Sequence, residues 1–143
     1  MQIKRTVETG ADPAAVFAYL SDFTNTEEWD PGTVSTTRVE GEGGVGTVYE
    51  NESEFNGRRS QLRYHVVERV PERRFVLSGE GKGATADDVM EFEALPDGGT
   101  RVTYTADIRL RGLGRFVEPL LSGAFKKLGD EAEQGMRTAL ERL

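Results

Sequence analysis

The chain has 143 residues, of which 36% are hydrophobic and 30% are charged. Its formal net charge is −7, and it contains no cysteine. This length and composition suit one soluble domain spanning residues 1–143, as a monomer or a homodimer. The negative charge disfavours a sequence-independent grip on nucleic acid, and no apolar run approaches the ~20 residues needed for stable membrane insertion. Because the chain lacks cysteine and an apolar signal-peptide region at its start, we expect a cytoplasmic protein without disulfides, thiolate nucleophiles or cysteine-bound metals.

The first part of the chain is predicted to form a strand followed by two short helices. Residues 2–9 alternate between apolar and polar side chains, which is typical of a half-exposed strand. Asp12 and Pro13 suit the N-cap and the first position of a helix over residues 13–21. Residues 22–29 predict a second short helix, which a Pro-Gly turn would end.

From residue 33 the pattern changes to alternating strands separated by turn residues. Asn56-Gly57 is the strongest hairpin signal among these turns. Consecutive strands joined by tight turns must run antiparallel, so these segments predict an antiparallel sheet. The six strands are expected over residues 33–40, 47–55, 58–70, 73–81, 85–95 and 100–110.

The segment 113–143 is predicted to form one long amphipathic helix over the sheet, with its regular part starting at Pro119. Three glycines inside it would cost about 1 kcal/mol each relative to alanine, so something should compensate. Close approach to the sheet is the favoured explanation, and room left for a guest molecule is the alternative. The apolar stripe recurs every four residues, at Phe116, Leu120, Ala124, Leu128, Ala132, Met136 and Leu140. It is widened at its start by Val117, Leu121 and Phe125 and continued at its end by Ala139 and Leu143.

Alternation separates each strand into a polar outer face and a mainly apolar inner face. The inner face nevertheless carries the polar residues Tyr49, Asn51, Ser53, Tyr64, Asp88 and Tyr104. Buried polar groups need partners or water, so one interpretation is a cavity with a few orienting polar groups. The alternative is that the tyrosines reach solvent at the rim while Asn51 and Ser53 pair with each other.

Motifs that could indicate other chemistry have plainer explanations. Gly41, Gly43 and Gly46 match a dinucleotide-binding pattern, but they precede a strand rather than a helix, so they predict a turn. His65, the single histidine, falls on the outer face, away from Ser53, which argues against a Ser-His-Asp relay. No His/Asp/Glu cluster has metal-ligand spacing, so we expect neither a metal nor a cofactor.

Asp88 is the inward-facing member of the pair Asp87–Asp88, because neighbours on a strand point to opposite faces. If Asp88 were buried among aromatic residues its pKa would rise, and it could act as an acid or base. Tyr104 is the second candidate catalytic residue. The favoured interpretation of Asp88 is a solvated carboxylate at a strand end.

The order of elements and several turns resemble the START-like (SRPBCC) superfamily, in particular its polyketide cyclase/dehydrase and lipid-transport group. The residues that carry this resemblance span the chain: Asp12-Pro13, Val16-Phe17, Phe23, Trp29, Gly41–Thr47, Val67–Pro71, Gly98–Val102 and the final helix. These motifs are structural turns, so they are specific for fold and poor for function. The resemblance implies an α+β helix-grip fold: an antiparallel sheet of about seven strands, in the order strand, two helices, six strands and helix, curving around the C-terminal helix.

The same resemblance implies a cavity between sheet and helix for a small hydrophobic or amphipathic molecule, such as a lipid, a quinone or a polyketide. The alternative is an enzyme of the cyclase/dehydratase kind, which positions such a ligand for general acid–base chemistry. A protein–protein module using Trp29 lacks specific support, since Trp29 is expected as a lid or core residue. The predicted ligand-binding residues are Trp29, Tyr49, Asn51, Ser53, Phe55, Tyr64, Phe75, Met90, Phe92, Tyr104, Phe116, Leu120 and Ala124.

Overall fold

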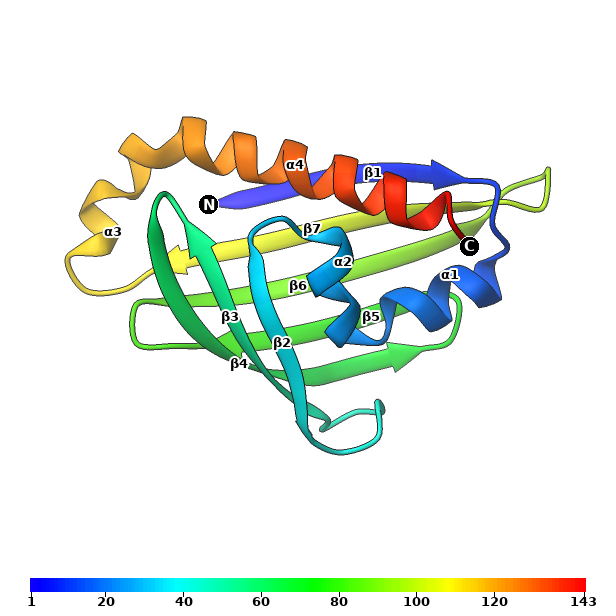
Figure 1. Cartoon of the computed structure of the whole chain (residues 1–143), viewed down its shortest axis with the longest axis horizontal. Helices are drawn as coiled ribbons and strands as arrows, with labels where there is room; N and C mark the ends of the chain where they lie inside the picture. The colour runs from blue at the N-terminus through cyan, green and yellow to red at the C-terminus, as the bar shows by residue number, and fades with distance from the viewer.

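The computed structural model describes residues 1–143 and confirms the expected order of strand, helices, six strands and C-terminal helix (Figure 1). The second predicted helix, over residues 22–29, is a 3-10 turn followed by one turn of α-helix. The elements are β1 (Gln2–Thr9), α1 (Pro13–Leu20), η1 (Phe23–Asn25), α2 (Thr26–Trp29), β2 (Thr33–Glu40), β3 (Val48–Phe55), β4 (Arg58–Val70), β5 (Arg74–Glu80), β6 (Ala84–Ala94), β7 (Thr100–Leu110), α3 (Gly114–Val117), η2 (Glu118–Leu121) and α4 (Ser122–Leu140).

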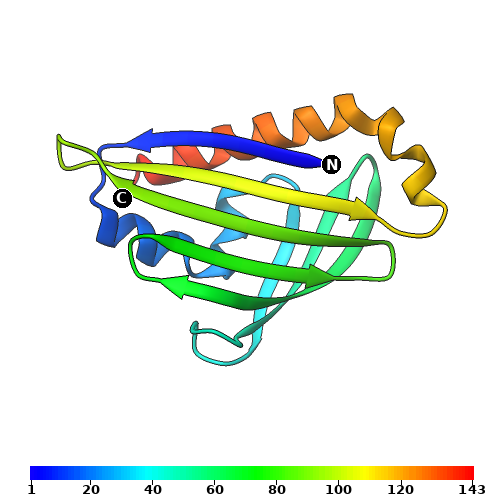
Figure 2. The ribbon, with the colours of Figure 1, turned by 180° about the vertical axis from the view of Figure 1, so that it is seen from behind.

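All seven strands form one antiparallel sheet in the order β1-β7-β6-β5-β4-β3-β2. Strand β1 pairs with β7, with Val7 opposite Val102. The first strand of the chain therefore lies at one edge of the sheet, next to the last strand. The register shifts between β2 and β3 and between β4 and β5, and such irregularities bend and twist a sheet. The helices cover one side of the curved sheet, and Figure 2, seen from behind, shows the strands in front of them.

Local sequence explains how α1 starts. The carboxylate of Asp12 accepts a hydrogen bond from the backbone N–H of Ala15 at 2.8 Å, and Pro13 occupies the first helical position. The helix buries Val16, Phe17 and Leu20 against the sheet, as residues spaced three and four apart on one helix face would. The predicted helix start is therefore confirmed.

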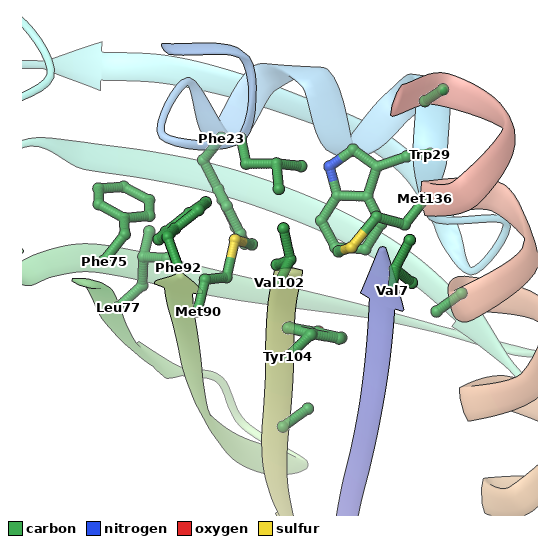
Figure 3. Packing of buried hydrophobic residues seen from close by; sticks show 14 of the residues in the cluster. Val7, Phe23, Trp29, Phe75, Leu77, Met90, Phe92, Val102, Tyr104 and Met136 are labelled. Carbon is green, nitrogen blue, oxygen red and sulfur yellow. The ribbon is translucent and has the colours of Figure 1, made fainter. Parts of the chain in front are cut away.

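Large side chains fill the core beneath α1 and α2 (Figure 3). The ring of Phe17 makes edge contacts with Phe75 and Phe92, at centroid distances of 6.4 and 5.1 Å. The ring of Trp29 stands edge-on to Tyr104 at 5.4 Å and is buried. Trp29 is thus a core residue, and this half of the molecule is closely packed.

The C-terminal segment corrects one prediction. The long helix begins at Ser122 rather than Pro119, because Pro119 lacks an N–H and lies in the 3-10 turn η2. The change of axis breaks the phase of the predicted stripe, so Phe116 and Leu120 are 65% and 81% exposed instead of facing the sheet. The buried face of α4 consists of Phe125, Gly129, Ala132, Met136, Ala139 and Leu140.

Close approach accounts for two of the three helix glycines. A Cβ on Gly129 would lie 2.6 Å from Cγ2 of Ile3, and a Cβ on Gly135 would collide with the carbonyl oxygen of Trp29. Gly123, by contrast, has open space around it. Helix α4 therefore approaches β1 and α2 more closely than an alanine would allow.

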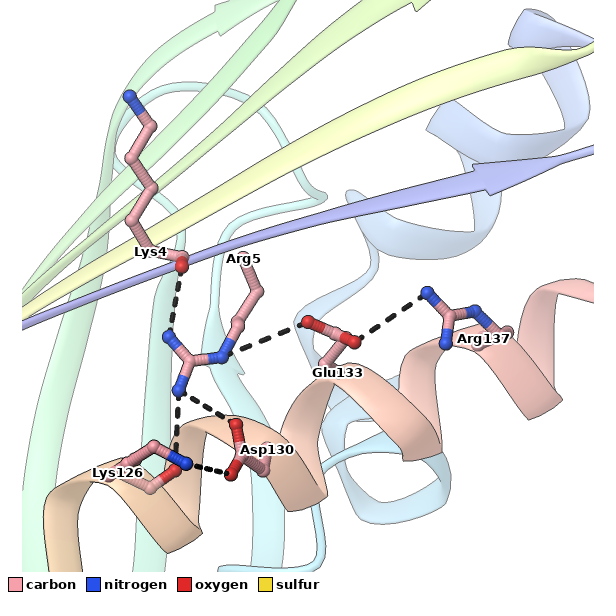
Figure 4. Close-up of polar contacts among 6 residues, drawn as sticks. All are labelled: Lys4, Arg5, Lys126, Asp130, Glu133 and Arg137. Carbon is pink, nitrogen blue, oxygen red and sulfur yellow. Dashed lines mark hydrogen bonds and ion pairs between the residues drawn. The ribbon is translucent and has the colours of Figure 1, made fainter. Parts of the chain in front are cut away.

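Polar contacts of Arg5, here called the Arg5 strap, hold α4 to β1 through Lys126, Asp130 and Glu133 (Figure 4). The guanidinium of Arg5 lies 3.0 Å from Asp130 and 3.8 Å from Glu133, and it also donates to the carbonyl of Lys126 at 3.3 Å. Glu133 in turn lies 3.6 Å from Arg137 on the same helix. These contacts fix the first half of α4 above β1, where the sheet and the helix enclose a cavity.

Candidate ligand cavity

A cavity of about 120 Å³ lies between the inner face of the sheet and the first half of α4. Its apolar wall is built by side chains of β6, β7 and α4. These include Ala84, Ala86, Ala106, Ile108, Leu110, Phe125, Leu128, Gly129 and Ala132. Its polar residues come from five segments of the chain and include Asp30, Asn51, Ser53, Ser60, Tyr64, Asp88 and Tyr104.

The size of the side chains along β6 explains why the cavity lies at this end. Ala84 and Ala86 face inward over the cavity, whereas Met90 and Phe92 face inward over the packed half of the core. Opposite the alanines, α4 presents Gly129 and Ala132. Short side chains on both walls leave a space that larger residues fill elsewhere in the same core.

Asp88 lies on the cavity wall near the middle of β6, paired with Ala106 of β7. The hydroxyl of Tyr104 donates a hydrogen bond to Oδ2 of Asp88 at 3.1 Å, and Asp88 is only 4% exposed. Burial raises the pKa of Asp88 to about 7 and raises that of Tyr104 well above its ordinary value. The favoured interpretation of Asp88 as a solvated strand-end carboxylate is therefore wrong.

A second acid, Asp30, lines the cavity from the loop between α2 and β2. Its carboxylate accepts hydrogen bonds from the backbone N–H of Gly32 at 3.0 Å and from the hydroxyl of Thr33 at 3.1 Å. Burial raises the pKa of Asp30, and these hydrogen bonds partly oppose that shift. Asp30 was not among the predicted site residues, because an Asp before Pro-Gly is an ordinary turn residue. Nothing in its local pattern predicts that the loop folds over a cavity.

The alternative interpretation, that Asn51 and Ser53 pair with each other while the tyrosines reach solvent, is correct only for the first part. The hydroxyl of Ser53 donates to Oδ1 of Asn51 at 2.7 Å, and Nδ2 of Asn51 donates to Thr36 at 2.9 Å. The expected pairing of Asn51 with Ser53 is thus present, although both residues also line the cavity. The tyrosines do not reach solvent at the rim: Tyr49, Tyr64 and Tyr104 are all buried.

The structure divides the predicted ligand-binding residues into three groups. The cavity is lined by Asn51, Ser53, Phe55, Tyr64 and Tyr104, together with the candidate acid Asp88. A second group is buried outside the cavity lining, consisting of Trp29, Tyr49, Phe75, Met90 and Phe92. The third group comes from the C-terminal segment and does not line the cavity; it consists of Phe116, Leu120 and the half-buried Ala124.

The cavity residues of α4 agree with the predicted stripe only in part. Phe125, Leu128 and Ala132 belong to that stripe and line the cavity, whereas Ala124 does not. The ring of Phe125 stacks on Phe55 of the β3–β4 hairpin, with centroids 4.6 Å apart. Gly129 is the cavity position of the helix that the stripe missed, because a glycine contributes no apolar side chain to the pattern.

Comparison with known proteins places this fold in a family. The family model for polyketide cyclase / dehydrase and lipid transport matches residues 1–143, so the chain belongs to that family. A search among curated proteins gave no match. None of the helices in the structure is both long and apolar enough to cross a bilayer.

Solved structures with the same fold are distant in sequence. The ZhuI aromatase/cyclase from Streptomyces sp. R1128 has a TM-score of 0.81 at 15% identity, covering 99% of this chain and 94% of that chain. A protein from Thermus thermophilus has a TM-score of 0.81 at 17% identity, with coverage of 98% and 97%. A START superfamily protein from Mycobacterium smegmatis has a TM-score of 0.79 at 13% identity, with coverage of 99% and 97%. These similarities confirm the START-like, helix-grip fold.

Proposed function

We propose that this protein binds a small hydrophobic or amphipathic molecule, of the lipid, quinone or polyketide kind, in the cavity between the sheet and α4. The observation that carries the proposal is the cavity itself, with an apolar wall and a few buried polar groups. Ligand sites in proteins combine these two features. Membership of the polyketide cyclase / dehydrase and lipid transport family supports the same conclusion.

The cavity volume limits how much of a ligand is enclosed. A space of about 120 Å³ is smaller than the roughly 300–1,000 Å³ of drug-sized sites. It is closer to the roughly 150 Å³ of an engineered cavity that binds benzene. We therefore expect one ring, or a short alkyl segment, to be enclosed. A longer ligand would extend past partly exposed residues of the cavity wall, such as Phe55, Leu110 and Leu128.

The proposal is tested by filling the cavity. We expect Ala86→Leu to remove thermal stabilisation by cavity ligands, because the added carbons would occupy the space beside Asp88. Ala94→Leu on the same strand is the matched control, since Ala94 is exposed and lies outside the cavity. Native mass spectrometry and thermal-shift assays with lipids, quinones and aromatic polyketides would measure binding. The proposal fails if the wild-type protein binds none of them, or if Ala86→Leu binds them as the wild type does.

A second candidate is catalysis on such a ligand, and the buried pair Asp88 and Tyr104 favours it. A carboxyl with a pKa of about 7 suits proton transfer at neutral pH, and Tyr104 holds one of its oxygens at 3.1 Å. If a polyketide-like ligand is converted to product, the double variant Asp88→Asn, Tyr104→Phe should bind it yet lose turnover. Undiminished product formation, measured by mass spectrometry, would remove these residues from the reaction.

A further inference from the structure

All the charged residues that line the cavity are acidic. Asp30, Asp88 and Glu54 line the cavity, and no lysine, arginine or histidine does so. The guanidinium of Arg5, on strand β1, packs against Gly129 but does not line the cavity, and it is paired with Asp130 and Glu133. An anion inside this cavity would therefore meet only acids and neutral dipoles.

We propose that the cavity selects ligands whose polar group donates a hydrogen bond, namely an alcohol, a phenol or an amine, and excludes ligands that carry a carboxylate. This inference rests on the proposed function, because it requires that the cavity holds a ligand. It narrows that function by separating fatty acids and other acids from neutral or cationic molecules of the same shape.

The preference for a donor follows from the hydrogen bonds that Asp88 makes. A carboxylate has acceptor sites on both oxygens, about four in total. The protein supplies one donor, the hydroxyl of Tyr104 to Oδ2, and makes no hydrogen bond to Oδ1. Oδ1 is not among the fully buried atoms, so it stays accessible from the cavity, and a ligand hydroxyl or ammonium could donate a hydrogen bond to it.

The exclusion of anions follows from the groups that face Asp88. Tyr104 extends from β7 and Tyr64 from β4, while Asp30 approaches from the α2–β2 loop and Asp87 is its neighbour on the outer face. The cavity residues of α4 are all uncharged: Phe125, Leu128, Gly129 and Ala132. A ligand carboxylate would lose its water and gain no cation, and repulsion from Asp88 would be greatest above pH 7, where Asp88 is ionised.

Three probes of one size test the selectivity: benzyl alcohol, benzylamine and benzoate. Their affinities would be measured at pH 8 by ligand-observed NMR and thermal shift on the full chain. We expect the alcohol and the amine to bind, and benzoate to bind at least about tenfold more weakly, the factor that corresponds to one pKa unit of differential interaction.

A matched pair of variants assigns the effect to Asp88. Asp88→Asn removes the charge and keeps an oxygen that can accept from Tyr104, so benzoate affinity should rise toward that of benzyl alcohol. Asp87→Asn makes the same change on the exposed outer face one residue away, and it should leave the ratio unchanged.

The outcomes separate this inference from the proposed function. If benzoate binds the wild-type protein as tightly as benzyl alcohol, or if Asp87→Asn relaxes the selectivity as much as Asp88→Asn, the inference is wrong and the proposed cavity binding stands. If none of the three probes binds, and the lipids, quinones and polyketides fail as well, both are wrong.

Discussion

At the scale of single residues, two buried polar groups differ in what they can do. The indole N–H of Trp29 is buried without a hydrogen-bond partner, which costs roughly 1–3 kcal/mol by analogy with other orphaned groups. Asp88 is also buried, but it can take up a proton, and it lies on the cavity wall. A carboxyl buried in an apolar wall destabilises the fold when it is charged. It also supplies a reactive or selective group inside the cavity.

This cost predicts how stability depends on pH. The pKa of Asp88 rises from 3.8 in the unfolded chain to about 7 in the native state. Between these values the native state binds more protons than the unfolded state, so the contribution of Asp88 to stability falls as pH rises from about 4 to about 7. A shift of this size corresponds to about 4 kcal/mol as an upper limit.

We therefore expect Asp88→Asn to gain stability relative to the wild type as pH rises, by a few kcal/mol between pH 4 and pH 8. Urea denaturation of both proteins at these two pH values would measure it. Asp87→Asn serves as the control, because Asp87 is exposed. Parallel stability curves for wild type and Asp88→Asn would contradict a strongly raised pKa.

At the scale of elements, the C-terminal segment shows why helical periodicity alone wrongly placed Phe116, Leu120 and Ala124 on the cavity. The spacing of apolar residues predicts a helix equally well with several starting points. The α-helical path is interrupted by Pro119, and the chain passes through α3 and η2 before α4 begins. Two glycines of α4 then allow an approach to β1 and α2 that sets which face is buried.

The helix glycines give a matched test of close approach. Gly135→Ala should destabilise the protein despite the higher helix propensity of alanine, because the new methyl group would collide with the backbone of Trp29. Gly123→Ala has open space and should stabilise by up to about 1 kcal/mol. Thermal unfolding of the two variants would show opposite signs. Equal stabilisation by both would mean that α4 does not press on α2 as described.

At the scale of the whole molecule, a packed half and a hollow half share one sheet. Phe17, Phe75 and Phe92 fill the half beneath α1, whereas alanines of β6 and β7 leave space beneath the first half of α4. The packed half and the Arg5 strap hold the sheet and α4 in place around this space. The contacts that hold the sheet and α4 together therefore lie outside the cavity, so the cavity can persist in the folded protein.

Replacing Phe125 with a smaller residue would enlarge the hollow half of the molecule. Phe125→Ala should cost roughly 3–5 kcal/mol of unfolding free energy, as expected for a buried phenylalanine, and it should enlarge the cavity so that bulkier ligands bind. Leu120→Ala, at an 81% exposed position in η2 just before α4, should change stability by about 0.5 kcal/mol or less. Denaturant titration and binding of a ligand series of increasing size would measure both effects. Similar losses for the two variants would argue that the C-terminal segment packs as the sequence pattern predicts.

The sequence by itself determined the elements and the fold. Alternation, Asn56-Gly57 and the Asp12–Pro13 helix start are local signals, because turn chemistry and side-chain period act over a few residues. The positions of Asn51, Ser53, Tyr64, Asp88 and Tyr104 on one inner face also follow from a period of two. Only the tertiary structure decided where the hollow lies, that Asp88 is buried and that Asp30 joins it. These depend on how closely α4 approaches and how the α2–β2 loop folds over the sheet, which are contacts between segments far apart in the chain.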